Sequence, residues 1–222
     1  MTLEMAESMV PPYSGTGTEV NLWFEITQEN KVILHSPKVE MGQGTFTSLA
    51  QIVADELDVT MDQVEVVGAA TGTGIVDGMS TGGSLSVASL WMPLREMAAT
   101  MREMLKSEAA KKMGIASTDI TTKEGVLSSG GNTMTYAEVA ADVTEWEVPD
   151  TPPLRPVSEY KFIGKPISRI DLAAKVFGDP IFGMDAEMPD MLHACVIRPE
   201  HIGATLLRAD TQKAEGMPGV VA

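Results

Sequence analysis

Alternating apolar and polar positions predict two short strands near the start of the chain. Residues 20–27 alternate, residues 31–36 form an extended apolar run, and Gln28-Glu29-Asn30 suits the turn of a β-hairpin between them. Apolar residues then recur at helical spacing and predict a helix over about 45–57, followed by a strand over 63–67. The helical positions are Phe46, Leu49, Ala50, Val53, Ala54 and Leu57.

A second and longer helical pattern runs from about residue 84 to residue 113. Pro93 lies inside it, so we expect either a kink or a helix that starts nearer Trp91. Its apolar stripe is typical of a face that packs on a core. The stripe consists of Val87, Leu90, Trp91, Leu94, Met97, Ala98, Met101, Met104 and Leu105.

The middle of the chain carries signals for short strands, a turn and one small helix. Residues 120–123 and 126–128 read as strands, and Gly130-Gly131-Asn132 reads as a hairpin turn. Thr135 and Glu138 have the spacing of a capping box, which predicts a helix from there to about residue 144. Four prolines within residues 147–156 predict a stiff linker and a domain boundary.

Beyond that segment the pattern returns to strands. We expect strands over 181–188, 192–198 and 204–209, a short helix over 210–215, and the start of another strand at 220–222. Cys195 lies in an apolar run, which favours a buried structural thiol. Residues 1–19 are polar and rich in Gly and Thr, so they are expected to form a loose arm.

Composition narrows the classes of function. The 222 residues carry a formal charge of −15, which argues against direct binding to nucleic acid or anionic lipid. No apolar run approaches the roughly 20 residues that a membrane helix needs. One cysteine excludes an internal disulfide or iron–sulfur site, and three scattered histidines give no metal-ligand spacing. The carboxylate pairs Asp55/Glu56 and Glu103/Glu108 are expected to be solvated helix faces.

Two glycine-rich junctions precede the two long helices. They are Met41-Gly42-Gln43-Gly44 and Ser80-Thr81-Gly82-Gly83-Ser84. Glycines allow close approach, and the start of a helix offers unpaired N–H groups to an anion. A tight turn with a solvent-facing Gln43 is the plainer interpretation of the first junction alone. Two such junctions in one domain favour a shared anionic ligand, although neither has Walker or Rossmann spacing.

The ordered motifs resemble the molybdopterin-binding large subunit of the xanthine dehydrogenase/aldehyde oxidase family, and within it the isoquinoline 1-oxidoreductase β-subunit branch. The resemblance covers about residue 20 to the end of the chain. Its motifs are Glu40-Met41-Gly42-Gln43-Gly44 with Thr47, Ala54-Asp55-Glu56-Leu57, Ser80–Ser84 with Trp91, Leu94 and Arg95, Phe162-Ile163-Gly164-Lys165-Pro166, Arg169 and Asp171, Lys175-Val176, Phe182, Asp185, Pro189, Met191-Leu192, Arg198-Pro199 and Met217-Pro218-Gly219-Val220.

The resemblance implies an α+β fold in permuted order. Residues 20–146 would form part of a molybdopterin-binding domain, a mixed sheet with two helices, and residues 147–162 a Pro-rich linker. Residues 163–222 would begin an α/β hammerhead domain. Gly42, Gln43 and Gly44 would contact the pterin and its pyrophosphate. The second cofactor-lining segment would be Thr81, Gly82, Gly83 and Ser84.

The resemblance also implies a function and partners. The family hydroxylates aldehydes or N-heteroaromatic rings with water-derived oxygen and passes electrons to a separate [2Fe–2S] subunit. The cofactor would be molybdopterin, alone or as a cytosine dinucleotide, bound only in a complete assembly. The catalytic glutamate of the family and an export signal have no counterpart here, so we expect an N-terminal part that is inactive alone. No catalytic residue or metal ligand is therefore assigned, and the compartment stays open between cytoplasm and periplasm.

Two other functions remain open at this point. An inactive remnant could act as a non-catalytic protein-interaction module through its acidic surface. An unrelated nucleotide-binding enzyme is the third hypothesis, although no motif supports it.

Overall fold

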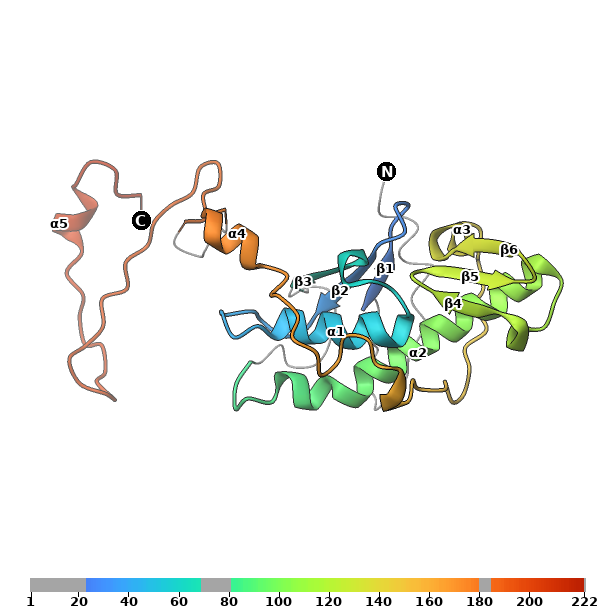
Figure 1. The fold of residues 1–222 in the computed structure, drawn as a ribbon. Helices are drawn as coiled ribbons and strands as arrows, with labels where there is room; N and C mark the ends of the chain where they lie inside the picture. Colours follow the sequence, from blue (N-terminus) through green and yellow to red (C-terminus); the bar gives the residue numbers. More distant parts are fainter. Residues whose placement is uncertain (1–22, 69–80, 180–184, 222) are drawn as a thin grey trace. The chain divides into compact units, whose positions relative to one another are not determined.

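A computed structural model describes residues 23–68, 81–179 and 185–221. The expected arm over residues 1–19, and residues 181–184 of an expected strand, lie outside these ranges. The chain divides into two compact units, Met1–Asp179 and Pro180–Ala222 (Figure 1). Each unit is described by itself.

The first unit is built around a small mixed sheet in the order β1-β2-β3. Strands β1 (Phe24–Ile26) and β2 (Val32–Ser36) form the expected antiparallel hairpin. Strand β3 (Val64–Gly68) pairs parallel to β2, which requires a crossover connection. Helix α1 (Thr45–Leu57) provides that crossover, with the bounds that its apolar spacing predicted.

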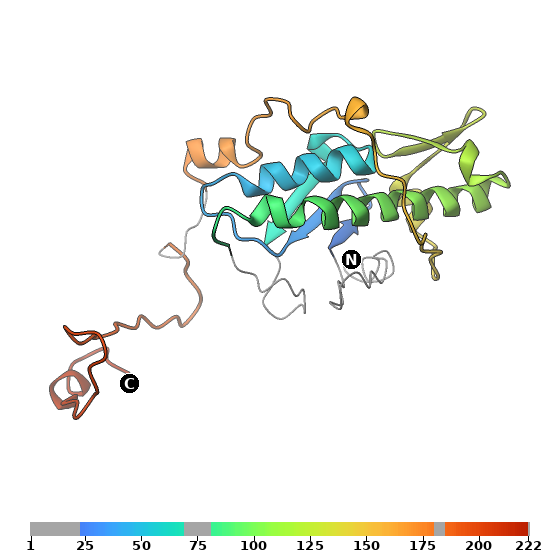
Figure 2. The ribbon, with the colours of Figure 1, turned by 90° about the horizontal axis from the view of Figure 1, so that it is seen from below.

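The core of this unit lies around α1, which contacts both β3 and the long helix α2 (Ser86–Met113). Both helices run along the same side of the sheet (Figure 2). Burial of their apolar stripes is the main source of stability here. The core residues with no exposed surface include Leu34, Leu49, Leu57, Leu94 and Leu105.

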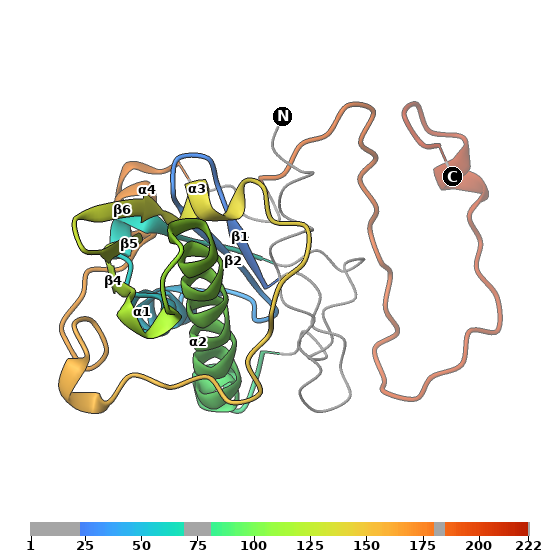
Figure 3. The same cartoon turned by 90° about the vertical axis from the view of Figure 1, so that its right-hand side faces the viewer.

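A second, antiparallel sheet follows α2. Its strands are β4 (Thr121–Lys123), β5 (Val126–Ser129) and β6 (Asn132–Thr135), in that order. The predicted hairpin turn is confirmed, because β5 and β6 pair antiparallel around Gly130-Gly131, although the bounds of β6 were not predicted. The sheet and α3 (Tyr136–Ala140) lie near the C-terminal end of α2 (Figure 1, Figure 3).

Helix α3 opens with the predicted capping box. The Glu138 N–H donates to Thr135 Oγ1 at 3.1 Å, and the Thr135 N–H donates to Glu138 Oε2 at 2.7 Å. The helix ends at Ala140, so the expected extension to residue 144 is wrong. The described residues of the unit also contain the 3-10 turns η1 (Met61–Gln63), η2 (Ser117–Asp119) and η3 (Val157–Glu159).

Helix α2 begins at Ser86 and continues through Pro93, so a start nearer Trp91 is wrong. A proline deprives the carbonyl four residues earlier of its helical partner. Here that carbonyl belongs to Ser89, and both Ser89 and Pro93 are exposed. Water can therefore satisfy the carbonyl, which reduces the cost of proline inside the helix.

The segment after α3 returns along α1 toward its N-terminal end (Figure 2). We call residues 153–171 the strap. It leads into α4 (Leu172–Phe177), a helix that was not predicted. The compact unit extends through Asp179, so the Pro-rich segment over 147–162 lies inside it. The assignment of 163–222 to a hammerhead domain stays a prediction.

The second unit has little regular structure in its described residues, 185–221. Helix α5 (Gln212–Glu215) confirms the predicted helix. The strands expected over 192–198 and 204–209 are absent there, and Cys195 is exposed, so these predictions are wrong. A strand requires a hydrogen-bonded neighbour, and the described residues of this unit do not pair with one another. Ile197 and Leu207 are each 94% exposed.

Candidate functional site

The start of α1 holds a carboxylate that belongs to the chain itself. Glu40 Oε1 accepts from the N–H groups of Gly42 at 2.8 Å and Gly44 at 3.0 Å, and its Oε2 accepts from Phe46 at 3.2 Å. The expectation of unpaired N–H groups is therefore wrong for these three. An acidic side chain suits the positive end of a helix. Gly42 and Gly44 adopt φ values of 103° and 85°, which favour glycine.

Gln43 ties the same loop together from its exposed side. Its Oε1 accepts from the Met41 N–H at 2.6 Å, and its Nε2 donates to the Val39 carbonyl at 2.8 Å. A primary amide carries two N–H hydrogens, and the Val39 bond uses one of them. The side chain of Gln43 is thus fixed in place and keeps a second N–H hydrogen that can bind a ligand.

The two glycine-rich junctions meet at Val39. The Val39 N–H donates to Thr81 Oγ1 at 2.9 Å, while the Val39 carbonyl accepts from Gln43. A hydroxyl oxygen that accepts in this way can still donate its own hydrogen. The side chains of Thr81, which is partly buried, and of Gln43, which is exposed, are therefore both bonded to the main chain of Val39, and each keeps one hydrogen to donate. The structure thus connects Gln43 and Thr81 through hydrogen bonds to the same residue, Val39.

The other predicted residues of the second junction flank Thr81. Gly82, Gly83 and Ser84 are exposed, and Gly83 and Ser84 have positive φ values of 60° and 59°. Helix α2 begins two residues after Ser84. Ser80 lies outside the described residues. Gly82, Gly83 and Ser84 thus form an exposed turn just before α2.

The charge of Glu40 is balanced locally. Arg169, from the strap, donates from Nη2 to Glu40 Oε1 at 3.2 Å and from Nη1 to the Gly42 carbonyl at 2.7 Å. Burial alone would raise the pKa of Glu40, but the N–H groups of Gly44, Phe46 and Gly42 and the charge of Arg169 together lower it. Glu40 is therefore ionised at neutral pH and paired, and the loop presents neutral donors beside it.

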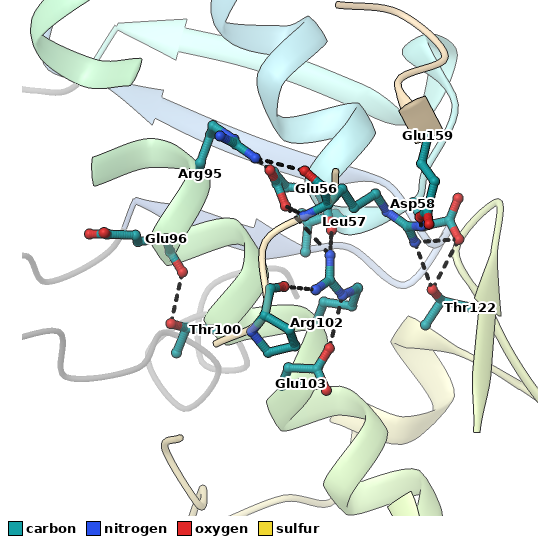
Figure 4. A network of polar contacts seen from close by, with 12 residues as sticks. Glu56, Leu57, Asp58, Arg95, Glu96, Thr100, Arg102, Glu103, Thr122 and Glu159 are labelled. Carbon is teal, nitrogen blue, oxygen red and sulfur yellow. Dashed lines mark hydrogen bonds and ion pairs between the residues drawn. The ribbon is translucent and has the colours of Figure 1, made fainter. Parts of the chain in front are cut away.

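A second polar cluster lies at the opposite end of α1 (Figure 4). The Glu56 side chain has no exposed surface. Its Oε1 accepts from Arg95 Nε at 2.6 Å and its Oε2 from the Arg155 N–H at 3.0 Å. Arg102 lies 3.6 Å from the same carboxylate and also donates to the Glu56 carbonyl and to the Pro153 carbonyl.

Asp58 and Asp55 add further contacts between α1 and the strap. Asp58 forms ion pairs with Arg155 at 2.7 Å and with Lys161 at 2.5 Å. Asp55 accepts from three consecutive strap N–H groups at 2.7 to 3.2 Å. Those N–H groups belong to Lys161, Phe162 and Ile163.

The prediction of solvated carboxylate pairs is therefore wrong for Asp55, Glu56 and Glu108, all of which are buried. Glu103, with its side chain 18% exposed, pairs with Arg102 and Lys106. Sequence reasoning missed this network because its partners are distant in the chain. The available signal was Arg95 and Arg102, two arginines seven residues apart on one side of α2.

Arg95 also joins the strap to α2 through aromatic rings. Its guanidinium carbon lies 5.1 Å from the Trp91 ring centre and 5.5 Å from that of Tyr160. Both distances suit cation–π contacts. Trp91 and Arg95, two residues of the family motif, therefore hold the fold in this structure.

The described part of the chain offers neither a metal cluster nor a membrane-spanning helix. No group of three or more His, Cys, Asp or Glu residues in 23–68, 81–179 and 185–221 is arranged to hold a metal ion. Within the same ranges, every helix is too short or too polar to cross a membrane.

Comparison with known proteins gives a family and three relatives. Residues 4–180 match the molybdopterin cofactor-binding domain family. The chain is 33% identical to a nicotinate dehydrogenase subunit of Pseudomonas putida, covering 92% of this chain and 18% of that protein. It is 29% identical to the membrane-bound aldehyde dehydrogenase (pyrroloquinoline-quinone) of Gluconacetobacter polyoxogenes, covering 91% and 27%. It is 27% identical to the β-subunit of isoquinoline 1-oxidoreductase of Brevundimonas diminuta, covering 99% and 35%. The chain thus spans 18% to 35% of these relatives' lengths.

Proposed function

The chain belongs to the molybdopterin cofactor-binding domain family, and on that premise we propose that its first unit supplies one wall of the cofactor site of a molybdenum hydroxylase. The substrates would be N-heteroaromatic compounds or aldehydes, the classes named in its relatives. Oxygen would come from water, and electrons would pass to a separate [2Fe–2S] subunit. Activity would require that subunit and the remainder of the large subunit.

The observation that carries this proposal is the shared use of Val39. One peptide segment fixes Gln43 through its carbonyl and Thr81 through its N–H. Val39 and Thr81 are 42 positions apart, so two loops that are distant in the sequence are bonded to one residue, and each keeps a hydrogen-bond donor. Such an arrangement suits a ligand that carries several acceptor atoms at close spacing, as a pterin or a pyrophosphate does.

The residues present fit this cofactor. The free hydrogens of Gln43 and Thr81 are donors, and Gly82 and Gly83 allow the backbone to approach closely. The one acid at the loop, Glu40, is bound by three N–H groups and Arg169. When bound, the molybdenum cofactor supplies the redox chemistry, and these residues bind and orient it. We extend the proposal to a cytosine dinucleotide form, whose pyrophosphate would use the same donors.

A non-catalytic interaction module is the second candidate. It is favoured by the exposed apolar side chains of the second unit, such as Ile197 and Leu207. The two candidates differ in one measurable property. A cofactor wall requires molybdenum in the mature assembly, whereas an interaction module does not.

Metal analysis of the co-expressed assembly tests the proposal. The chain is produced with the reading frames that adjoin its gene, and molybdenum and pterin are measured per folded assembly. The variant Gln43→Ala/Thr81→Val removes two donors that contribute about 1 kcal/mol each, so binding should weaken by roughly 10- to 30-fold. The matched variant Gln28→Ala/Thr133→Val changes exposed residues of the same types and should keep its molybdenum. Unchanged molybdenum in the first variant, or none in the mature assembly, would overturn the proposal.

A further inference from the structure

The strap is bound along the whole length of α1. Gln51 Nε2 donates to the Phe162 carbonyl at 2.6 Å, and the Ile170 N–H donates to Thr47 Oγ1 at 3.2 Å. With the Asp55 contacts, these bonds place successive strap residues beside successive turns of α1, in antiparallel order. The last residues of the strap therefore lie beside the loop that precedes α1.

Arg169, near the end of the strap, contacts the loop before α1, and its side chain is held in place by Asp171. Its Nε and Nη2 donate to the two carboxylate oxygens of Asp171 at 2.9 and 2.8 Å. Asp171 is also paired with Lys175 of α4 at 2.5 Å. These partners hold the pKa of Asp171 far below its usual range, so the pair stays ionised. A bidentate pair of this kind orients the guanidinium plane.

The guanidinium of Arg169 donates to two acceptors in the loop of residues 40–44. It binds the Gly42 carbonyl and Glu40 Oε1, the oxygen that also accepts from Gly42 and Gly44. Without Arg169, the Glu40 carboxylate would keep an uncompensated negative charge beside Gln43. That charge would oppose the approach of a phosphate-bearing ligand.

We propose that Arg169 is a positioning residue that locks the loop of residues 40–44 and cancels the charge of Glu40, so that cofactor binding depends on a docked strap. The locking of the loop follows from the contacts alone. The consequence for the cofactor rests on the proposed function above. The two parts therefore need separate measurements.

Backbone amide exchange in the full 222-residue chain tests the locking and needs no cofactor. We expect Arg169→Gln to speed exchange over residues 40–46 by about tenfold or more and to leave residues 49–57 unchanged. Asp171→Asn should give a smaller change in the same segment. Lys123→Gln, which removes an exposed positive charge on β4, is the control and should change neither. Unchanged exchange over 40–46, or equal acceleration throughout α1, would overturn the locking role.

Molybdenum content of the co-expressed assembly tests the charge role. Arg169→Gln should retain several-fold less molybdenum than Lys123→Gln. Glu40→Gln/Arg169→Gln removes both charges and should recover part of the loss. A merely structural role predicts no recovery, and that result would overturn the charge role. Because a failed Gln43→Ala/Thr81→Val test leaves the exchange result standing, failure of the proposed function is distinguishable from failure of this inference.

Discussion

The strap is bound by acidic residues at both ends of α1, but the two ends differ in burial. At the C-terminal end, Glu56 has no exposed side-chain surface and contacts two arginines of α2. At the N-terminal end, Glu40 retains 12% exposure and adjoins the exposed Gly42 and Gln43. Glu56, the buried acid, therefore serves to hold α1, α2 and the strap together. Glu40, at the surface, orders the loop of residues 40–44 and leaves the donors of Gln43 and Thr81 available to a ligand.

This difference has an energetic basis. A buried charge loses its hydration and depends wholly on its partners, so removing one partner is costly. An exposed pair is screened by water and contributes little to stability. Substitutions at the C-terminal end of α1 should therefore lower mainly stability, and those at the N-terminal end mainly ligand binding.

The largest expected effect is that of Glu56→Gln. The variant leaves Arg95 and Arg102 without their buried counter-charge, and we expect the free energy of unfolding to fall by about 3 kcal/mol or more. Denaturant unfolding of the full chain measures this. Glu159→Gln is the matched control, because its side chain is 55% exposed and should cost under about 1 kcal/mol. Equal losses in the two variants would contradict the assigned difference.

Asp55→Asn should have an intermediate effect. The two oxygens of its carboxylate accept from three strap N–H groups. The amide of asparagine has only one acceptor oxygen, so some of these N–H groups would lose their partner. We expect a loss of about 1–3 kcal/mol, with faster proteolysis inside residues 153–171. Asp62→Asn, an exposed residue of η1, should leave both properties unchanged. If the Asp55 variant is cleaved within residues 153–171 at the wild-type rate, the strap is held by other contacts.

The smallest expected effect is the pH response of the loop. The pKa of Glu40 lies below its ordinary value of 4.5, so its contribution is complete above that pH and is lost as pH falls through the lowered pKa. The pKa of Asp171 is also held far below its usual range, so Arg169 keeps that partner over the same window. The amide NMR signals of Gly42 and Gly44 should titrate below pH 4.5. Titration at or above pH 4.5 would contradict the assigned contacts.

The sequence predicted features that depend on neighbouring residues. Helix α1 and the capping box of Thr135 and Glu138 follow from local spacing, and both are confirmed. The hairpin of β1 and β2 follows from alternation around a polar turn. Local spacing also identified the two glycine-rich junctions as candidates for one ligand.

Features that depend on distant residues could not be predicted in this way. The burial of Glu56 requires Arg95, 39 positions away, and the strap contact of Asp55 requires residues 106 to 108 positions away. The bond from Val39 to Thr81 and the contact from Arg169 to Gly42 are equally remote. The apolar run over 192–198 predicted a strand, but an apolar run does not supply a neighbouring strand to pair with.

The most direct test of the central claim is an experimental structure of the mature, cofactor-loaded assembly. We expect polar atoms of the cofactor to lie within hydrogen-bonding distance, roughly 2.7–3.2 Å, of Gln43 Nε2 and Thr81 Oγ1. We also expect Glu56 to keep its arginine partners and not to touch the cofactor. A cofactor bound away from Gln43 and Thr81, with the loop of residues 40–44 facing only water or protein, would contradict the claim.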